Sequence, residues 1–407
     1  MHLFLCAEDS EAELRSELAQ FPAAGGIEPV DLDAPSSLPA PPGGLAVSWS
    51  KGLPPQLPCL AFARQLLPDA LPVRAESIRG WADRLVAAVA GTLPDDHPWS
   101  LHIEPHYGAR TTRHIGARAW HSARLEARVE RRRMKIPNQP ATVGQPDAAA
   151  GRQRCRLIRE AVLELLQRKR RHLLRQLRRE PAPFTARDSL VQLLLTAPDA
   201  GFLSVAPAPL AFEQRHLISP FPKGEVPAAV DKAAPSRAFA KLVEAELRLG
   251  CAIRAGETCV DLGASPGSWT YVAVSRGARV IAVDRSPLRE DLMRSRQVEF
   301  RQGDAFGFQP PRPVDWLLCD VIAAPERTAA LLLEWLRRGW CRHFVVTFKV
   351  GKGQATGGEG PSGDVLAALK RNLPPLTREL FLTRLCANKR ELCAFGSARQ
   401  PNPPAKY

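Results

Sequence analysis

The pattern of hydrophobic and polar positions changes near residue 233, and its two sides predict different kinds of domain. Before that point the apolar runs are short and irregularly spaced, with a strand expected at 2–6, an amphipathic helix at 78–89 and a strand at 101–104. After it, apolar runs alternate regularly with helical patterns, which is typical of a doubly wound α/β fold. The chain therefore predicts a smaller α+β region followed by an α/β domain.

The expected boundaries follow from composition. The ranges are 1–215 for the α+β region, 216–232 for a proline-rich linker, 233–400 for the α/β domain and 401–407 for a tail. Within the first region, residues 21–58 are rich in proline and glycine and are expected to form loops. A helix is predicted to begin at Ser10, where Glu13 three residues later completes the pattern of a capping box.

A basic segment at about 131–180 stands out within the α+β region. A helix is predicted over 153–179, with one apolar face made by Leu157, Ile158, Val162, Leu165, Leu166, Leu173, Leu174 and Leu177. The other face carries Arg152, Arg154, Arg156, Arg159, Arg168, Lys169, Arg170, Arg171, Arg175, Arg178 and Arg179. Such a face can follow the phosphates of a nucleic acid. The alternative is a solvated surface on a helix that packs by its leucine stripe.

The overall charge points to the same class of partner. Lys and Arg number 56 against 42 Asp and Glu, which leaves a formal net charge of +14. An excess of this size favours a polyanion, most often nucleic acid. An arginine-rich and lysine-poor composition could also produce the excess without any such partner.

Cysteine, histidine and hydropathy patterns exclude several classes of protein. The nine cysteines show no C-x-x-C spacing, so they are expected to be reduced thiols and not a disulfide framework or a zinc site. His102 and His106 flank a predicted strand but lack a third ligand, so no metal site is expected. No apolar run reaches the roughly 18 residues of a membrane span. A soluble, cytoplasmic protein is therefore predicted, without a membrane partner.

The candidate chemistry begins at two strands of the α/β domain. A buried strand at 258–263 ends in Asp-Leu-Gly and is followed by Ala-Ser-Pro-Gly-Ser-Trp over 264–269, a tight turn into a helix. Small residues there let a ligand approach the N–H groups at the start of the helix. The next strand ends in Asp284, where such folds bind a ribose diol. This spacing fits a dinucleotide, S-adenosylmethionine or no ligand at all.

The specific residues of this turn and of later blocks distinguish between these ligands. Asp-Leu-Gly-Ala-Ser-Pro-Gly-Ser-Trp over 261–269 resembles the first motif of the FtsJ-like RNA 2′-O-methyltransferases. Further blocks resemble the bacterial M-type branch, which methylates a cytidine of 23S rRNA; they lie at 234–237, 317–321, 335–342 and 388–392. The resemblance covers roughly 220–396. In the first half of the chain the resemblance rests on Phe-Ala-Arg-Gln at 62–65 and on the position of a THUMP-like RNA-binding domain. The basic segment at 131–180 looks like an insertion that the family does not usually carry.

The resemblance implies a catalytic tetrad of Lys241, Asp320, Lys349 and Glu391. A ribose 2′-hydroxyl is a poor nucleophile, so it must be held in line with the methyl group and lose its proton. A lysine can accept that proton only if its pKa is lowered, which burial and a neighbouring lysine both favour. Lys349 is expected to contact the hydroxyl, and the two carboxylates are expected to orient the two lysines.

The same resemblance implies the residues that bind S-adenosylmethionine. They are Asp261, Gly263, Ser265, Pro266, Gly267, Ser268, Trp269, Asp284, Asp304 and Asp320. Asp261 is expected either to support the turn or to approach the amino group of the cofactor. Two departures from the family pattern occur: Ser268 replaces a second glycine, and the glycine-rich stretch after Lys349 is either a lid that contacts RNA or a disordered loop.

The leading hypothesis is therefore S-adenosylmethionine-dependent 2′-O-methylation of a ribose, expected on a cytidine of 23S rRNA or of a precursor large ribosomal subunit, by a monomeric enzyme. One alternative is a non-catalytic RNA-binding or ribosome-assembly factor with a methyltransferase fold, for which an intact tetrad would be unnecessary. Another is a nicotinamide-dependent oxidoreductase. The turn departs from Gly-x-Gly-x-x-Gly and carries proline where a dinucleotide fold enters its helix, which disfavours that alternative.

Overall fold

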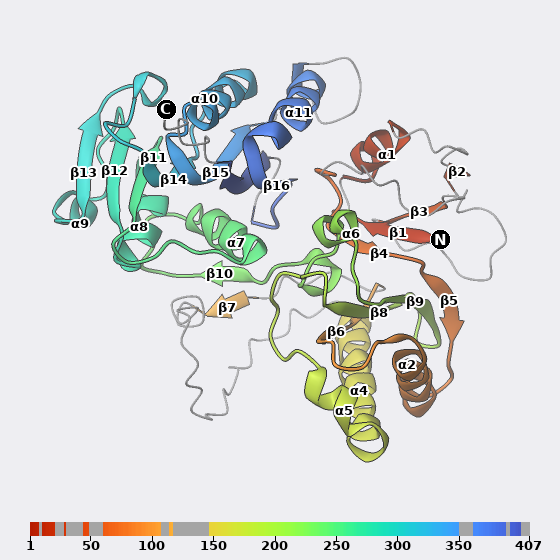
Figure 1. Ribbon diagram of the computed structural model, residues 1–407. Helices are drawn as coiled ribbons and strands as arrows, with labels where there is room; N and C mark the ends of the chain where they lie inside the picture. The colour runs from red at the N-terminus through yellow and green to blue at the C-terminus, as the bar shows by residue number, and fades with distance from the viewer. Residues whose placement is uncertain are drawn as a thin grey trace, which may run out of the picture.

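The computed structural model describes residues 1–7, 10–20, 28–29, 44–48, 60–106, 114–116, 146–349, 361–387 and 391–399. Parts of the predictions lie outside these ranges: most of the loops at 21–58, the first part of the basic segment, residues 388–390 of the last motif, the stretch after Lys349 and the tail. In Figure 1 the α/β domain lies on one side of the molecule and the N-terminal elements lie on the other.

A seven-stranded sheet forms the centre of the C-terminal domain, in the order β13-β12-β11-β14-β15-β17-β16. Its strands are β11 (Thr258–Leu262), β12 (Arg279–Asp284), β13 (Val298–Gln302), β14 (Val314–Cys319), β15 (Cys341–Lys349), β16 (Thr377–Thr383) and β17 (Glu391–Ala398). Strands β11 to β15 run parallel, and β17 runs antiparallel to both of its neighbours. The strand order reverses between β12 and β14, at β11, which confirms the prediction of a doubly wound fold.

Helices cover both faces of this sheet. They are α7 (Phe239–Leu249), α8 (Ser268–Ser275), α9 (Glu290–Met293), α10 (Pro325–Arg337) and α11 (Pro361–Asn372), with short 3₁₀ turns at Ala305–Gly307 and Pro374–Leu376. Side chains of α7 and α8 pack with Cys259 and Trp316 on one face, whereas α10 and α11 pack with Val260 and Leu317 on the other. Alternate residues of the buried strands thus supply two apolar layers.

Two four-stranded sheets make up the N-terminal region. The first has the order β2-β3-β1-β4 and is accompanied by helix α1 (Glu11–Ala19); its strands are β1 (His2–Leu5), β2 (Glu28–Pro29), β3 (Gly44–Ser48) and β4 (Gln65–Leu67). The second has the order β5-β9-β8-β6; its strands are β5 (Leu71–Arg74), β6 (Trp99–Pro105), β8 (Ser189–Leu195) and β9 (Ala200–Ala206). Helices α2 (Ile78–Thr92), α4 (Pro146–Lys169) and α5 (Arg171–Gln176) pack on one face of the second sheet. The predicted strand at 101–104 and helix at 78–89 are confirmed.

Helix α4 belongs to the core of this sheet. Ile158, Val162 and Leu166 are fully buried against Trp99 and the residues of α2. One helix over 153–179 was expected, but the chain breaks at Arg170, where φ is −146° and ψ is 56°. The assignment of Leu157 to the apolar face is wrong, because 39% of this residue is exposed. The described part of the basic segment is therefore an integral part of the core of the second sheet.

Two local expectations at the N-terminus are wrong. The side chain of Ser10 makes no capping hydrogen bond to helix α1. Its Oγ instead accepts a hydrogen bond from Arg384 Nη1 at 2.5 Å, a partner that lies far away in the sequence. The stretch expected to form only loops contains β3, which pairs along its length with β1.

The predicted linker also contributes regular structure. Helix α6 (Phe212–Leu217) crosses its expected start, and a 3₁₀ turn at Pro222–Gly224 precedes β10 (Ala228–Val230). Strand β10 pairs in parallel with β7 (His114–Gly116). The predicted linker is therefore connected to the N-terminal region by backbone hydrogen bonds as well as by the chain.

The N-terminal region also contacts the C-terminal domain directly. The buried carboxylate of Glu17 accepts hydrogen bonds from the backbone of Ala61 at 2.9 Å and Phe62 at 3.0 Å, and from Lys370 Nζ of α11 at 2.5 Å. Because a buried carboxylate is costly without such partners, this contact favours one arrangement of the two parts. No helix in the described ranges is long and apolar enough to cross a bilayer.

Candidate active site

The turn between β11 and α8 brings its backbone close to the edge of the sheet; we call residues 263–268 the glycine turn. Gly263 has a φ of +76° and Gly267 a φ of +107°, both in the region that favours glycine. A Cβ on Gly263 would lie 2.5 Å from Val321 Cγ1, so the turn packs tightly against the residues that follow β14. The sequence requirement for glycine is thus a requirement of space as well as of conformation.

Asp284 fastens the glycine turn to the end of β12. One carboxylate oxygen accepts a hydrogen bond from Ser265 N at 3.0 Å, and the other accepts one from Ser286 N at 2.8 Å. A carboxylate has about four acceptor positions, so these two bonds leave capacity for a diol. Asp304 lies further along the same edge, where it accepts hydrogen bonds from Phe306 N at 3.2 Å and Arg327 Nη2 at 3.1 Å.

Three of the predicted cofactor residues lie partly or wholly inside the protein. The side chain of Trp269 is 2% exposed, and its Nε1 donates to the carbonyl oxygen of Ala238 at 2.8 Å. Ser268 Oγ lies 2.7 Å from Ser236 Oγ. Asp261 is buried and accepts a hydrogen bond from Thr270 Oγ1 at 2.7 Å. Of the two expectations for Asp261, this geometry favours support of the turn.

The strand directions bring the four residues of the predicted tetrad to one edge of the sheet. Asp320 directly follows β14, Lys349 ends β15, and these neighbouring strands run parallel. Glu391 begins β17, which runs antiparallel to β15, so that Glu391 pairs in register with Lys349. Lys241 reaches the same place from helix α7.

The four side chains form a closed ring of alternating charge. Lys241 Nζ donates to both oxygens of Asp320, at 3.1 and 3.0 Å, and to Glu391 Oε2 at 2.6 Å. Lys349 Nζ donates to Asp320 Oδ1 at 2.6 Å and to Glu391 Oε1 at 2.8 Å. The side chains are between 12% and 22% exposed, so the ring is shielded but reachable from solvent.

The electrostatics of the ring correct one expectation. Burial opposes the charged form of Asp320, but Lys241 and Lys349 outweigh it and lower the pKa of that carboxyl. Burial also opposes the ammonium form of Lys349, but the charge of Asp320 and hydrogen bonds to Asp320 and Glu391 raise the pKa of the lysine. The expected lowering of the pKa of Lys349 is therefore wrong for this arrangement, because the two carboxylates stabilise the ammonium more than burial and the second lysine destabilise it.

Thr347 belongs to the site but was not singled out from the sequence. Its hydroxyl donates to Asp320 Oδ1, the oxygen that also accepts from Lys349. Thr347 and Lys349 are two residues apart on β15, so their side chains lie on the same face of the strand. The sequence signal for Thr347 was its position two residues before Lys349 in a strand, which places both side chains on the same face.

The glycine turn and the tetrad are adjacent. The backbone N–H of Asp320 donates to the carbonyl oxygen of Leu262 at 3.3 Å, immediately before the turn, and Val321 packs on Gly263. A ligand held against the turn would therefore lie beside Asp320 and Lys349, as a group-transfer reaction requires. Within the described ranges, no group of three His, Cys, Asp or Glu side chains is placed to hold a metal ion.

Comparison with known proteins agrees with this geometry. Residues 234–340 match the model of the FtsJ-like methyltransferase family. A ribosomal RNA large subunit methyltransferase M of Thauera aminoaromatica is 41% identical over 155 residues, which are 37% of this chain and 43% of that protein. The protein of the same name from Stutzerimonas stutzeri is 46% identical over 123 residues, which are 29% of this chain and 35% of that protein.

These matches confirm the resemblance that the motifs indicated: residues 234–340 are similar to an FtsJ-like methyltransferase domain, and the chain is similar to relatives of the M-type branch. The aligned part spans less than half the length of either curated relative. The residues that match the family model include Lys241, the glycine turn and Asp320.

Proposed function

We propose that this protein transfers a methyl group from S-adenosylmethionine to a ribose 2′-hydroxyl of large-subunit ribosomal RNA. The observation that carries the proposal is the closed ring of Lys241, Asp320, Lys349 and Glu391 beside the glycine turn. An FtsJ-like domain supports methyl transfer as the reaction. Relatives named for the large ribosomal subunit support its RNA as the substrate.

The residues at the sheet edge fit S-adenosylmethionine, which supplies an electrophilic methyl group when bound. The glycine turn and the first N–H groups of α8 offer a close backbone approach for its amino-acid part. Asp284 retains acceptor capacity for the ribose hydroxyls, and Asp304 lies where the adenine side is expected. Trp269 contributes by fixing the start of α8 from inside, because its ring is buried.

Lys349 is the residue that we assign to the 2′-hydroxyl. An ammonium group has three N–H donors, and two of those of Lys349 point to Asp320 and Glu391, which leaves one for the ribose oxygen. Loss of its proton produces the neutral amine, which accepts the hydroxyl proton as the oxygen becomes nucleophilic. Since the surrounding carboxylates raise the pKa of Lys349, the neutral form is scarce near pH 7, and the rate should increase with pH.

The finer details of the substrate follow from the resemblance. A cytidine of 23S rRNA, presented as naked RNA or within a precursor large subunit, is the target expected for the M-type branch. We assign the N-terminal region to RNA binding, as a THUMP-like module, because it carries the exposed arginines of α4 and α5. The net charge of +14 favours the same type of partner.

The competing function is a non-catalytic RNA-binding factor. Its chief difficulty is the tetrad, since placing four ionisable groups together at one edge costs desolvation that binding alone does not require. A nicotinamide-dependent oxidoreductase is disfavoured by the turn, in which Pro266 precedes Gly267 at the entry to the helix.

Single-turnover methylation tests the proposal. The substrate is 23S rRNA from cells that lack the gene, and the affinity for S-adenosylmethionine is measured in parallel by calorimetry. Lys349→Ala should reduce the rate by roughly 10²–10⁴-fold, the usual contribution of a positioned acid–base group, with cofactor affinity unchanged. Lys349→Arg should fail as well, since guanidinium does not release its proton near neutral pH.

Lys232→Ala, at an exposed lysine of the linker, is the matched control and should leave the rate unchanged. Substantial activity in Lys349→Arg would mean that residue 349 acts as a fixed cation, and the proton-transfer mechanism would be wrong. Absence of methylation by the unmodified protein on every rRNA preparation would favour the non-catalytic factor.

A further inference from the structure

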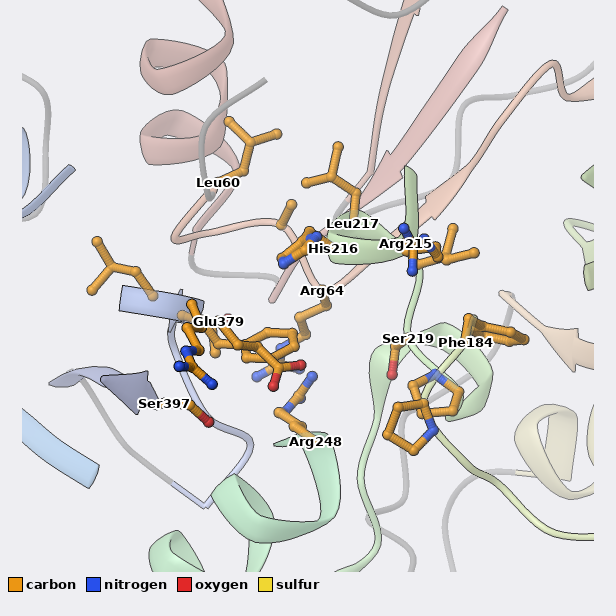
Figure 2. A pocket seen from close by; sticks show the side chains of 18 of the residues that line it. Leu60, Arg64, Phe184, Arg215, His216, Leu217, Ser219, Arg248, Glu379 and Ser397 are labelled. Atoms are coloured by element: carbon orange, nitrogen blue, oxygen red, sulfur yellow. The ribbon is translucent and has the colours of Figure 1, made fainter. Parts of the chain in front are cut away.

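A cavity of about 780 Å³ lies between the N-terminal region and the far end of the C-terminal sheet. Its walls come from the segment before β4, from the residues around α6 and from β16, the edge strand of the sheet (Figure 2). Arg342 and His343 at the start of β15 also line it, whereas Lys349 ends that strand. Lys349 lies six positions after His343 along β15, a distance of about 20 Å.

The charged residues that line this cavity are almost all basic; we call it the basic groove. They are Arg64, Arg215, Arg248, Arg342 and Arg378, and Glu379 is the single acid among the lining residues. Three of these arginines have partners within the protein: Arg248 pairs with Glu244 at 2.9 Å, Arg342 pairs with Asp315 at 3.0 Å, and Arg215 also has a partner. Burial raises the pKa of Glu379, which weakens its ability to neutralise the others.

Arg64 and Arg378 have no such partners. Within the part of the chain that the structure describes, neither side chain makes a hydrogen bond or an ion pair, and Arg64 Nε is shielded from solvent. Figure 2 shows Arg64 extending into the middle of the groove near Arg248. A partly buried guanidinium without a partner is unfavourable, so the open space beside it suits an anion that accepts its hydrogen bonds.

The groove is also large enough for more than a simple ion. Pockets that enclose drug-sized ligands range from roughly 300 to 1,000 Å³. Leu60, Leu217 and Leu382 give it apolar walls between the charged groups. Guanidinium forks above apolar surface suit a nucleotide, whose phosphate takes two parallel hydrogen bonds and whose sugar and base contact the walls.

We propose that the basic groove binds a phosphodiester of the RNA substrate, several nucleotides away from the ribose held at the tetrad, through Arg64 and Arg378. This inference rests on the proposed function, because it names a second contact for the same RNA. Both halves of the chain contribute to the groove, so the N-terminal region and the methyltransferase domain would hold one strand together. The distance along β15 sets the spacing between the two contacts.

The test is RNA binding by the full-length protein, measured without methylation. Arg64→Gln/Arg378→Gln is compared with the unmodified protein for a transcript of 23S rRNA over a series of salt concentrations. Removing one phosphate contact to a single strand reduces the slope of log affinity against log salt by about 0.7, and this decrease is expected for the double variant because both arginines are assigned to one phosphodiester. Affinity should fall at least tenfold, because the phosphate loses the charge-assisted hydrogen bonds of two guanidinium groups.

Arg294→Gln/Arg296→Gln is the matched control. Both arginines are exposed next to α9, at the opposite edge of the sheet from β16, and their removal should leave the slope unchanged. Thermal unfolding checks that each variant is folded. Inorganic pyrophosphate, added in millimolar amounts, should compete with RNA for the unmodified protein and not for the groove variant.

Two outcomes would overturn the inference. If the groove variant loses pyrophosphate binding but keeps its RNA slope, the phosphate in the groove belongs to a small molecule and not to RNA. If neither ligand is affected, the groove binds no anion. A third outcome separates the two proposals. If the unmodified protein does not methylate RNA, but its RNA binding still depends on Arg64 and Arg378, the proposed function is wrong and the assignment of the groove to RNA binding stands.

Discussion

The two ends of strand β15 use charge in opposite ways. At its carboxyl end, two lysines and two acids pair with one another at N–O distances between 2.6 and 3.1 Å. At its amino end, the basic groove leaves Arg64 and Arg378 without partners in the described structure. Charged side chains that pair with one another are fixed in position before a substrate binds, as catalysis requires. Unpaired charges acquire their partners from a ligand, as binding requires.

The sharpest test of this comparison is Asp320→Ala, because Asp320 accepts hydrogen bonds from both lysines and from Thr347. Its removal leaves two ammonium groups facing one carboxylate, so the lysines repel each other and lose their positions. We expect single-turnover methylation to fall about as far as in Lys349→Ala, by roughly 10²–10⁴-fold. RNA affinity measured separately should stay near that of the unmodified protein.

Asp320→Asn provides the control for volume. The amide fills the same space and still accepts one hydrogen bond, but it cannot neutralise the lysines. Its activity should therefore resemble that of Asp320→Ala. An Asp320→Asn protein with normal activity would mean that the ring is a structural contact and that its charge balance does not matter.

The same contrast explains how much could be predicted from the sequence. The fold of the C-terminal domain could be predicted from the sequence because its strands are continuous apolar runs that end at or next to Asp284, Asp320 and Lys349, and because glycines mark its turns. Parallel strands bring their carboxyl ends to one edge, so residues at strand ends were expected to meet. The structure brings all four tetrad residues together, as the motif positions indicated.

The remaining features depend on contacts between distant parts of the chain. No local pattern predicts that Arg64 and Arg378 line the same cavity, because the groove exists only after the two regions pack. The partner of Ser10 is Arg384, so a local capping pattern failed against a long-range hydrogen bond. The direction of the pKa shift of Lys349 was wrong because it depends on how closely the carboxylates approach, which spacing along the chain does not determine.

The arginines of α4 and α5 test whether unpaired charge also binds RNA outside the basic groove. Arg159 Nη1 donates to the carbonyl oxygen of Leu101 at 2.8 Å, and Arg178 pairs with the buried Asp188 at 2.6 Å, so both fasten the helices to the sheet. The exposed arginines and lysine are Arg156, which pairs with Glu160, and Arg168, Lys169, Arg170, Arg171, Arg175 and Arg179. We call this exposed set the arginine face.

Replacing Arg168, Arg170 and Arg175 by glutamine should reduce the salt slope of RNA binding by about 0.7–0.9 for each phosphate that is no longer neutralised. Substitution is the informative change, because deletion of the segment would also remove Ile158 and Val162 from the core. Arg79→Gln, at an exposed arginine of α2 that pairs with Asp83, is the control. An unchanged slope in the triple variant would mean that the arginine face is only a solvated surface.

The smallest expected effect concerns Asp261, which is buried without a cationic partner among the described residues and so differs from both ends of β15. Burial raises its pKa to about 7 in the folded protein, from an ordinary value of 3.8. Between these two pH values the folded state holds a proton that the unfolded state has lost, so stability declines as the pH rises through this window. Asp261→Asn removes that dependence, because the amide has no proton to lose and can still accept the hydrogen bond from Thr270.

The thermal midpoint of Asp261→Asn, measured without cofactor, should therefore rise relative to the unmodified protein between pH 5 and pH 8. A difference of one between the pKa values of the folded and unfolded states corresponds to about 1.4 kcal/mol of stability, and each kcal/mol corresponds to roughly 2–4 °C for a domain of 150–250 residues. Asp291→Asn, at an exposed acid whose pKa is lowered by Arg289, should differ from the unmodified protein by the same amount at both pH values. A midpoint difference for Asp261→Asn that does not change with pH would show that Asp261 is already ionised in the fold, and that the glycine turn is supported by a charged carboxylate.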